Sequence, residues 1–221
     1  MNEKNQTPLH YTYLHNSKGI GELLISKGAN MNVEMTNIIQ QQRKAGGIQH
    51  YYLRVQNQDD GLQKLLALFK TANINQVIVF ADTKHTVENI CEFFSQEHDG
   101  KMYDAAKYIK SGSFGMNRFQ RHRFQETVYL LNAKRVKMIV TDVTSSYFDE
   151  ADVHLVINFE GFSKDLNIDT YFNRANSAKI PGFCLTFVQN DFTIWSLQQF
   201  KELTGIEVKE LTEDKFNLLE Q

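Results

Sequence analysis

A cluster of basic side chains lies between residues 101 and 137 of this 221-residue chain. This block carries nine Lys and Arg residues against Asp104 and Glu126, a local net charge of +7 in a chain whose total is −2. The total is small because residues 138–221 carry six basic and fourteen acidic side chains. Clustered Lys and Arg supply the salt-dependent part of nucleic-acid binding. The basic block is therefore either an edge that faces phosphate groups or a set of solvated helix faces, and charge alone leaves both open.

Sequence patterns for nucleotide or metal chemistry are missing. The chain has neither the GxxxxGK[ST] nor the GxGxxG pattern of phosphate-binding loops, and it has no DEAD-like acidic quartet to hold Mg²⁺. Its two cysteines, Cys91 and Cys184, are 93 positions apart without CxxC spacing or clustered histidines. We therefore expect no metal site, no disulfide and no self-sufficient nucleotide site.

Apolar runs alternate with helical patterns after residue 48. Runs of this kind are typical of buried parallel strands, and they occur at 76–80, 138–141, 155–159 and 183–188. Apolar residues at helical spacing predict helices over 62–69, 87–94, 118–131 and 191–203. Asp59 and Asp60 are the capping candidates of the first helix, and Trp195 in the last is expected in the core. This alternation predicts an α/β fold, a parallel sheet with helices on both faces.

Polar residues follow the predicted strands where chemistry gathers in such a sheet, at the strand carboxyl ends. Asp82 and Thr83 follow the first apolar run, Thr141 and Asp142 close the second, and Glu160 follows the third. We expect any functional site to be built from these loops.

The first 33 residues have a different character. TPLH at 7–10 is typical of a helix start, because Thr can cap and Pro fits the first turn. ELLISKGAN at 22–30 reads as a second helix that ends at Gly28. The segment resembles a single ankyrin repeat, a family that recognises proteins. Because one repeat does not bury its own apolar face, it either packs on the rest of the chain, is loosely ordered or is the end of a longer array. Residues 34–47 are expected to be a linker.

Six short segments follow one another in residues 48–221: QHYY at 49–52, NQVIVF at 75–80, QRHR at 120–123, VTD at 140–142, TYFNR at 170–174 and the closing strand at 182–188. By the order of these motifs, more than by any one of them, residues 48–221 resemble the second RecA-like, or helicase C-terminal, domain of DEAD-box RNA helicases. The resemblance is greatest to the mRNA-export and splicing subgroup.

This resemblance implies a RecA-like sheet and a role in ATP-driven RNA remodelling by two such domains. It implies that Gln120, Arg123, Thr141 and Asp142 contact the RNA backbone. Gln120 and Arg123 lie three positions apart, on one face of a predicted helix within the basic block. Such contacts position RNA without reading its sequence. The alternative is a solvated helix with no ligand.

The nucleotide-facing positions depart from the family pattern. Asp149 stands where the family's ribose-contacting Asp is expected, and Arg174 matches the first arginine of motif VI. The second and third arginines fall on Ser177 and Ile180, and the nearby Lys179 does not reproduce a planar guanidinium. Arg174 itself has a structural alternative, an ion pair with an acid such as Asp149 or Asp169. The Walker A domain is missing from these residues, so we do not expect ATP hydrolysis by this chain alone. ATP and Mg²⁺ would enter only if a first RecA-like domain paired with it.

The expected function is a degenerate helicase C-terminal domain that binds RNA or a protein partner, such as a helicase core or an export or splicing factor, without catalysis. The alternatives are an ankyrin-type protein-interaction module with no RNA role, and the C-terminal fragment of an active helicase. The polar start MNEKNQTPLH and the lack of a long apolar run predict an intracellular protein without a membrane partner. Composition leaves nucleus and cytoplasm open, and the resemblance favours the nucleus.

Overall fold

A computed structural model of the chain describes residues 47–72, 74, 76–96, 106–109, 118–142, 148, 151–160 and 168–219. Of residues 106–109, 118–121, 123, 168–169, 192, 199 and 203 it describes the backbone only. The chain divides into two compact units, Met1–Arg43 and Lys44–Gln221, and the described residues all belong to the second. The ankyrin-like segment and the greater part of the linker therefore lie outside the described residues. Among the helices that the structure describes, none combines the length and apolarity needed to cross a membrane.

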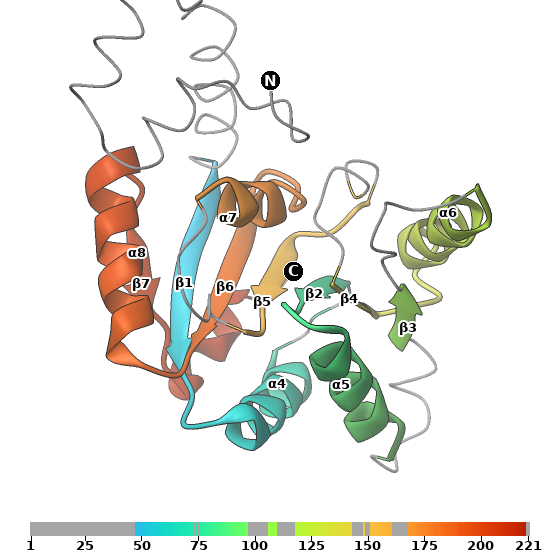
Figure 1. Ribbon diagram of the computed structural model, residues 1–221, viewed down its shortest axis with the longest axis horizontal. Coiled ribbons are helices and arrows are strands. Elements are labelled where there is room, and N and C mark those ends of the chain that lie inside the picture. Colours follow the sequence, from blue (N-terminus) through green and yellow to red (C-terminus); the bar gives the residue numbers. More distant parts are fainter. Residues whose placement is uncertain are drawn as a thin grey trace, which may run out of the picture. The chain divides into compact units, whose positions relative to one another are not determined.

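The described residues form a seven-stranded parallel sheet in the order β3-β4-β2-β5-β6-β1-β7 (Figure 1). Every residue of β2, β4 and β5 is buried. Parallel strands with both faces covered read as unbroken apolar runs, which is why VIVF, MIVT and LVIN form the centre of the sheet. The strands are β1 Ile48–Arg54, β2 Val77–Phe80, β3 Ala106–Ile109, β4 Met138–Thr141, β5 Leu155–Asn158, β6 Gly182–Val188 and β7 Val208–Glu210.

Helices cover both faces of this sheet (Figure 1). Residues of α4, α5 and the 3₁₀ helix η1 pack in one apolar core, and residues of α6, α7 and α8 pack in the other. Neighbouring residues of β2 belong to opposite cores, with Val79 in the first and Phe80 in the second. The helices are α4 Gln58–Thr71, α5 Lys84–Gln96, α6 Arg118–Asn132, α7 Ile168–Ala175, α8 Asp191–Thr204 and η1 Glu213–Leu219.

The expected α/β fold with a parallel RecA-like sheet is confirmed, but two local expectations are wrong. Helix α4 is capped by Asn57, whose side chain accepts the Asp60 N–H at 2.9 Å. The expected caps, Asp59 and Asp60, lie inside the helix instead. Trp195 is 54 % exposed, whereas its neighbour Ile194 is buried. Successive residues of an α-helix are rotated by about 100° about its axis. Ile194 therefore lies on the face that packs in the core, and Trp195 lies on the face exposed to solvent.

A polar site at the carboxyl ends of the central strands

The loops that follow β2 and β5 meet at the carboxyl edge of the sheet. Glu160, just after β5, accepts the backbone N–H of Asp82 through Oε2 at 2.7 Å. Its Oε1 accepts the hydroxyl of Thr86 in the first turn of α5. Thr83 Oγ1 in turn accepts the Thr86 N–H at 3.1 Å, which caps α5. The carboxylate of Glu160 therefore ties the β2–α5 loop to the residue that follows β5.

Arg174 reaches this edge from α7. Its Nη2 donates to Asp82 Oδ1 at 2.9 Å, and its guanidinium carbon lies 5.4 Å from the centre of the Phe80 ring. The Arg174 side chain is 4 % exposed and that of Asp82 is 26 % exposed. Phe80 is fully buried and meets Phe148 edge-on. Arg174 is thus held by a carboxylate on one side and an aromatic face below it.

Two donors of this guanidinium have no partner. Nε and Nη1 of Arg174 are buried and make no hydrogen bond within the described part of the chain. A buried donor without a partner costs free energy, and for a charged group this cost is larger. The single contact with Asp82 is therefore the main compensation for burying the Arg174 charge.

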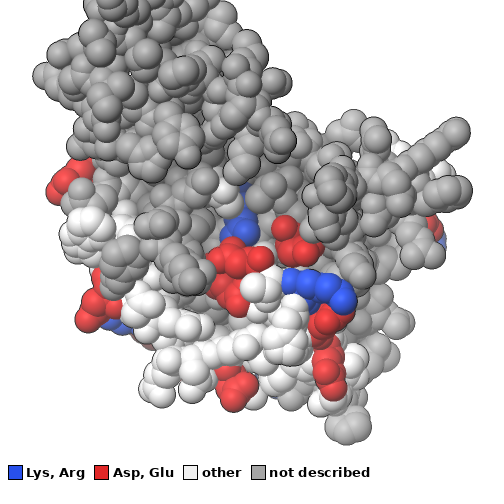
Figure 2. Space-filling model, viewed as in Figure 1, with Lys and Arg blue, Asp and Glu red and all other residues white. Residues whose placement is uncertain are grey.

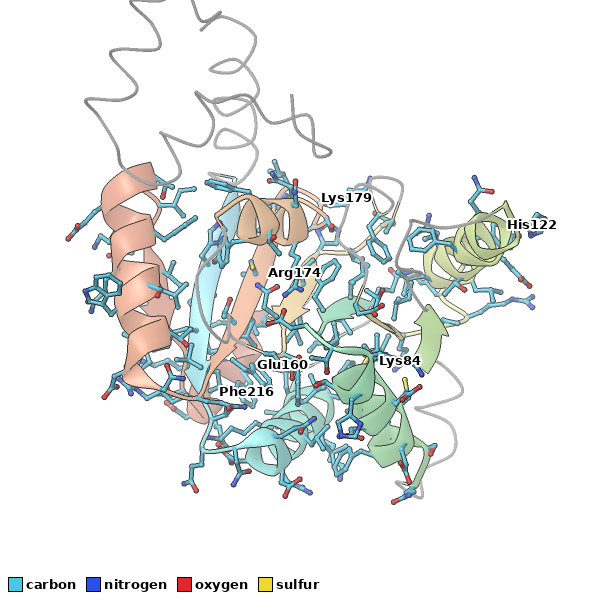
Figure 3. The ribbon with its side chains drawn as sticks, in the orientation of Figure 1. Lys84, His122, Glu160, Arg174, Lys179 and Phe216 are labelled. Atoms are coloured by element: carbon cyan, nitrogen blue, oxygen red, sulfur yellow. The ribbon has the colours of Figure 1, made fainter. Side chains whose placement is uncertain are left out.

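The face that holds these residues is acidic at its centre. Figure 3 shows Arg174 and Glu160 in the middle of the view, with Lys84 at the start of α5 beside them. Figure 2 shows Asp and Glu side chains gathered in the same region next to a few Lys or Arg side chains. Lys84 is paired with Glu88 at 3.0 Å and is exposed. Within the described ranges, no group of three His, Cys, Asp or Glu side chains is placed to hold a metal ion.

A layer of buried polar side chains lies under α7. The Tyr171 hydroxyl and His50 Nδ1 are 2.8 Å apart, and both side chains are buried. Asn158 Nδ2 donates to Thr186 Oγ1 at 3.2 Å and to Cys184 Sγ at 3.5 Å. The first contact anchors α7, the helix that carries Arg174, to β1, and the other two join β5 to β6.

This buried layer predicts a loss of stability at alkaline pH. Burial raises the pKa of Cys184 from its ordinary 9.0 to about 12 and also raises the pKa of Tyr171. Because the unfolded chain ionises first, their stabilisation is complete below about pH 9 and is lost as the pH rises towards 12. Urea unfolding at pH 8, 9, 10 and 11 should show a falling free energy of unfolding, with a shallower fall in Cys184→Ala. A free energy that stays level across this range would contradict the assignment.

The four residues that were predicted to contact RNA differ in their position and burial. Gln120 and Arg123 both lie on α6, as expected, although their side chains are outside the described part of the structure. Thr141, the last residue of β4, is fully buried, so its hydroxyl does not reach the surface in this structure. Asp142 follows it and is partly exposed. The RNA contacts of these four residues stay predictions.

The positions that the resemblance assigns to the nucleotide have different surroundings. Ser177 is buried, and its hydroxyl donates to the backbone oxygen of Asn173 at 3.3 Å. Asp149 lies outside the described residues. Arg174 forms an ion pair, but its partner is Asp82 and not Asp149 or Asp169, the acids that were expected. Asp82 lies 92 positions from Arg174, so local spacing does not identify it as the partner. Its loop follows the carboxyl end of a strand, however, and functional residues were expected in such loops.

Comparison with known proteins gives this fold a family context. No protein-family model matches the chain. It is 22 % identical to the ATP-dependent RNA helicase eIF4A of Yarrowia lipolytica over 145 residues, 66 % of this chain and 34 % of that protein. The eIF4A of Schizosaccharomyces pombe is 22 % identical over 166 residues, 75 % of this chain and 39 % of its own length. The chain thus spans less than two fifths of these relatives.

Solved structures agree with the sequence matches. The C-terminal domain of a Dbp5 variant from S. cerevisiae, bound to Gle1 and IP6, has a TM-score of 0.59 and 19 % identity, covering 77 % of this chain and 93 % of that one. A Dbp5 variant bound to RNA and ADP BeF3 has a TM-score of 0.61 and 19 % identity, covering 78 % and 43 %. The E. coli DEAD-box protein SrmB, bound to RraA, has a TM-score of 0.55 and 21 % identity, covering 76 % and 93 %.

The fold is that of a helicase C-terminal, RecA-like domain. Among proteins of this class, the chain resembles the C-terminal domains of the DEAD-box RNA helicases.

Proposed function

We propose that the chain is a helicase C-terminal-like domain that binds the RNA backbone, or a helicase partner, without hydrolysing ATP itself. The observation that carries this proposal is the placement of Arg174. Its guanidinium is buried, paired with Asp82 at 2.9 Å and packed over Phe80. An arginine that stabilises phosphoryl transfer must direct its donors at the transferred group, so an arginine engaged inside the fold supports a non-catalytic role.

The two positions that follow support the same proposal. Ser177 has a short hydroxyl that is engaged with Asn173, and Ile180 is an apolar side chain that is 52 % exposed. Neither supplies a cation at the positions where the resemblance expects the second and third arginines. ATP and Mg²⁺ would then matter only in a complex with a separate first RecA-like domain.

The RNA half of the proposal rests on α6. This helix carries Gln120 and Arg123 within the block whose net charge is +7. Dbp5, whose fold this chain shares, has been solved with RNA. RNA bound through such a helix would be gripped by its phosphates and not read by its bases. A nuclear location is part of the proposal, by analogy with the mRNA-export and splicing subgroup.

Arg123→Ala is expected to weaken the binding of single-stranded RNA about tenfold, because one charge-assisted phosphate contact is lost. The loss should shrink as salt increases, since phosphate contacts release counterions. A gel-shift titration over a salt series measures both effects. Lys215→Ala is the matched control, because it removes the same charge from η1, far along the sheet from α6. Binding that is indifferent to salt and to Arg123→Ala would refute the RNA proposal.

A second candidate is a protein-interaction module. Similar domains have been solved with protein partners, Dbp5 with Gle1 and SrmB with RraA. Under this reading the ankyrin-like residues 1–33 and the α/β domain dock a partner together, and the basic block is only solvated. A pull-down with and without residues 1–33 separates the two candidates, because an unchanged set of partners removes the repeat from the function.

A third candidate is a fragment of an active helicase. It requires ATP turnover when the chain is mixed with a separate first RecA-like domain. Absence of turnover in that mixture would eliminate it.

A further inference from the structure

Three unpaired cations follow the carboxyl end of α6. Lys134, Arg135 and Lys137 are all exposed, and none has an ion-pair partner within the described structure. They precede β4, so in this parallel sheet they lie at the amino edge. The acidic site formed by Asp82 and Glu160 is at the opposite edge. The two edges therefore differ in the charge that they present to a polyanion.

The backbone at Lys134 is unusual for a lysine. Its φ is +57°, in the left-handed region where helices commonly end with glycine. The Lys134 N–H donates to the Leu131 oxygen at 2.8 Å, and the Arg135 N–H donates to the Leu130 oxygen at 2.9 Å. This is the hydrogen-bond pattern of a glycine-terminated helix. A lysine there costs stability that glycine would not, and residues held in such conformations concentrate at functional sites.

Exposed side chains follow the outer face of α6 towards these cations. His122 points away from the sheet near the start of the helix (Figure 3). Tyr129 is 70 % exposed one turn before the end, while Val128 and Leu131 pack in the core. An exposed tyrosine beside cations offers a stacking face for an unpaired base. Fifteen helical residues span roughly 22 Å, the length of several nucleotides.

Attraction to the helix dipole does not account for this arrangement. Cations in the last turn of a helix are favourable, which would explain Lys134 and Arg135. It would not explain Lys137, which lies beyond the buried Val136 at the entry to β4, nor the exposure of Tyr129.

We infer that Tyr129, Lys134, Arg135 and Lys137, here termed the α6 end patch, form a second contact for single-stranded RNA. The inference rests on the proposed RNA binding and extends it. RNA held at Arg123 runs along the outer face of α6, and its phosphates meet the three cations while a base stacks on Tyr129. The exposed carboxylate of Glu126 lies on the same helix and opposes this path.

RNA length separates the two contacts. In fluorescence-anisotropy titrations of the full chain, the variant K134Q/R135Q/K137Q should bind a 20-nucleotide oligouridine about tenfold more weakly. Its affinity for a 3-nucleotide oligouridine should be unchanged, because that RNA is too short to reach from Arg123 to the α6 end patch. Losing three phosphate contacts should also lower the salt slope for the long RNA by about 2. Glu126→Gln should tighten binding of the long RNA about twofold, and Lys215→Gln should leave it unchanged.

Lys134→Gly adds a variant in which weaker RNA binding is not explained by a loss of folding. Glycine relieves the left-handed backbone, so Tm should rise by about 2 °C while the affinity for the long RNA falls about twofold. If the triple variant binds the long RNA normally while Arg123→Ala weakens it, the inference is overturned and the proposed function stands. If the unaltered chain binds neither RNA at any salt concentration, both are overturned.

Discussion

Replacing Asp82 with asparagine is expected to lower the free energy of unfolding by about 3 kcal/mol, the scale for a buried ion pair that loses one partner. The amide keeps the size of the carboxylate but removes its charge. Arg174, 4 % exposed and with two donors already unpartnered, would then be a buried cation that faces only the Phe80 ring and a neutral amide. Urea denaturation at neutral pH measures the loss. Asp59→Asn, an exposed acid of α4, is the control and should change the free energy by less than about 0.5 kcal/mol.

Replacing Arg174 should cost less stability than replacing Asp82, its partner in this ion pair. Arg174→Met removes the charge and leaves an apolar chain over Phe80, and Asp82 is exposed enough to be hydrated. Replacing a buried charge by an apolar group is often nearly neutral, so this variant should lose about 1 kcal/mol or less. The double variant D82N/R174M should regain most of the stability that Asp82→Asn loses. Equal losses for both single variants, with no recovery in the double variant, would mean that the pair does not hold α7 to the loop after β2.

Phe80→Ala is expected to lower the free energy of unfolding by about 3–5 kcal/mol, the scale for truncating a fully buried aromatic side chain. The ring is completely buried, it packs edge-on against Phe148, and it is the surface on which the Arg174 guanidinium lies. Thermal and urea unfolding followed by circular dichroism measure the loss.

A milder pair of variants isolates the contact with the cation. Phe80→Leu and Phe187→Leu remove similar volume from fully buried rings, and Phe187 packs against Phe159, with no cation over its ring in the described contacts. Phe80→Leu should cost about 0.5–1 kcal/mol more than Phe187→Leu. The same cost in both variants would show that the guanidinium gains nothing from the ring.

The central strands were predictable because they are buried on both faces. Their apolar runs need no partner to be recognised, and β2, β4 and β5 lie where those runs are. The edge strands β3 and β7 read AKYI and VKE, which are short and partly polar, so the sequence pattern does not separate them from loops. Helix α7, at eight residues, is too short to show a clear helical period.

The candidate site was only half predictable. Motif order identified Arg174 as a residue of interest, and the strand-end rule identified the loops of Asp82 and Glu160. The ion pair between Arg174 and Asp82 depends on how α7 crosses the sheet, which no local spacing encodes. The left-handed backbone of Lys134 was not predicted either. Glycine usually indicates this conformation in a sequence, and lysine does not.

The central proposal for this domain is RNA binding through α6 that does not require ATP. The most direct measurement is the anisotropy of a labelled 20-nucleotide oligouridine titrated with the full chain, at several salt concentrations, with and without ATP and Mg²⁺. We expect binding that weakens steeply with salt and is the same in the presence and absence of ATP. Binding that appears only with ATP, or no binding at low salt, would contradict it.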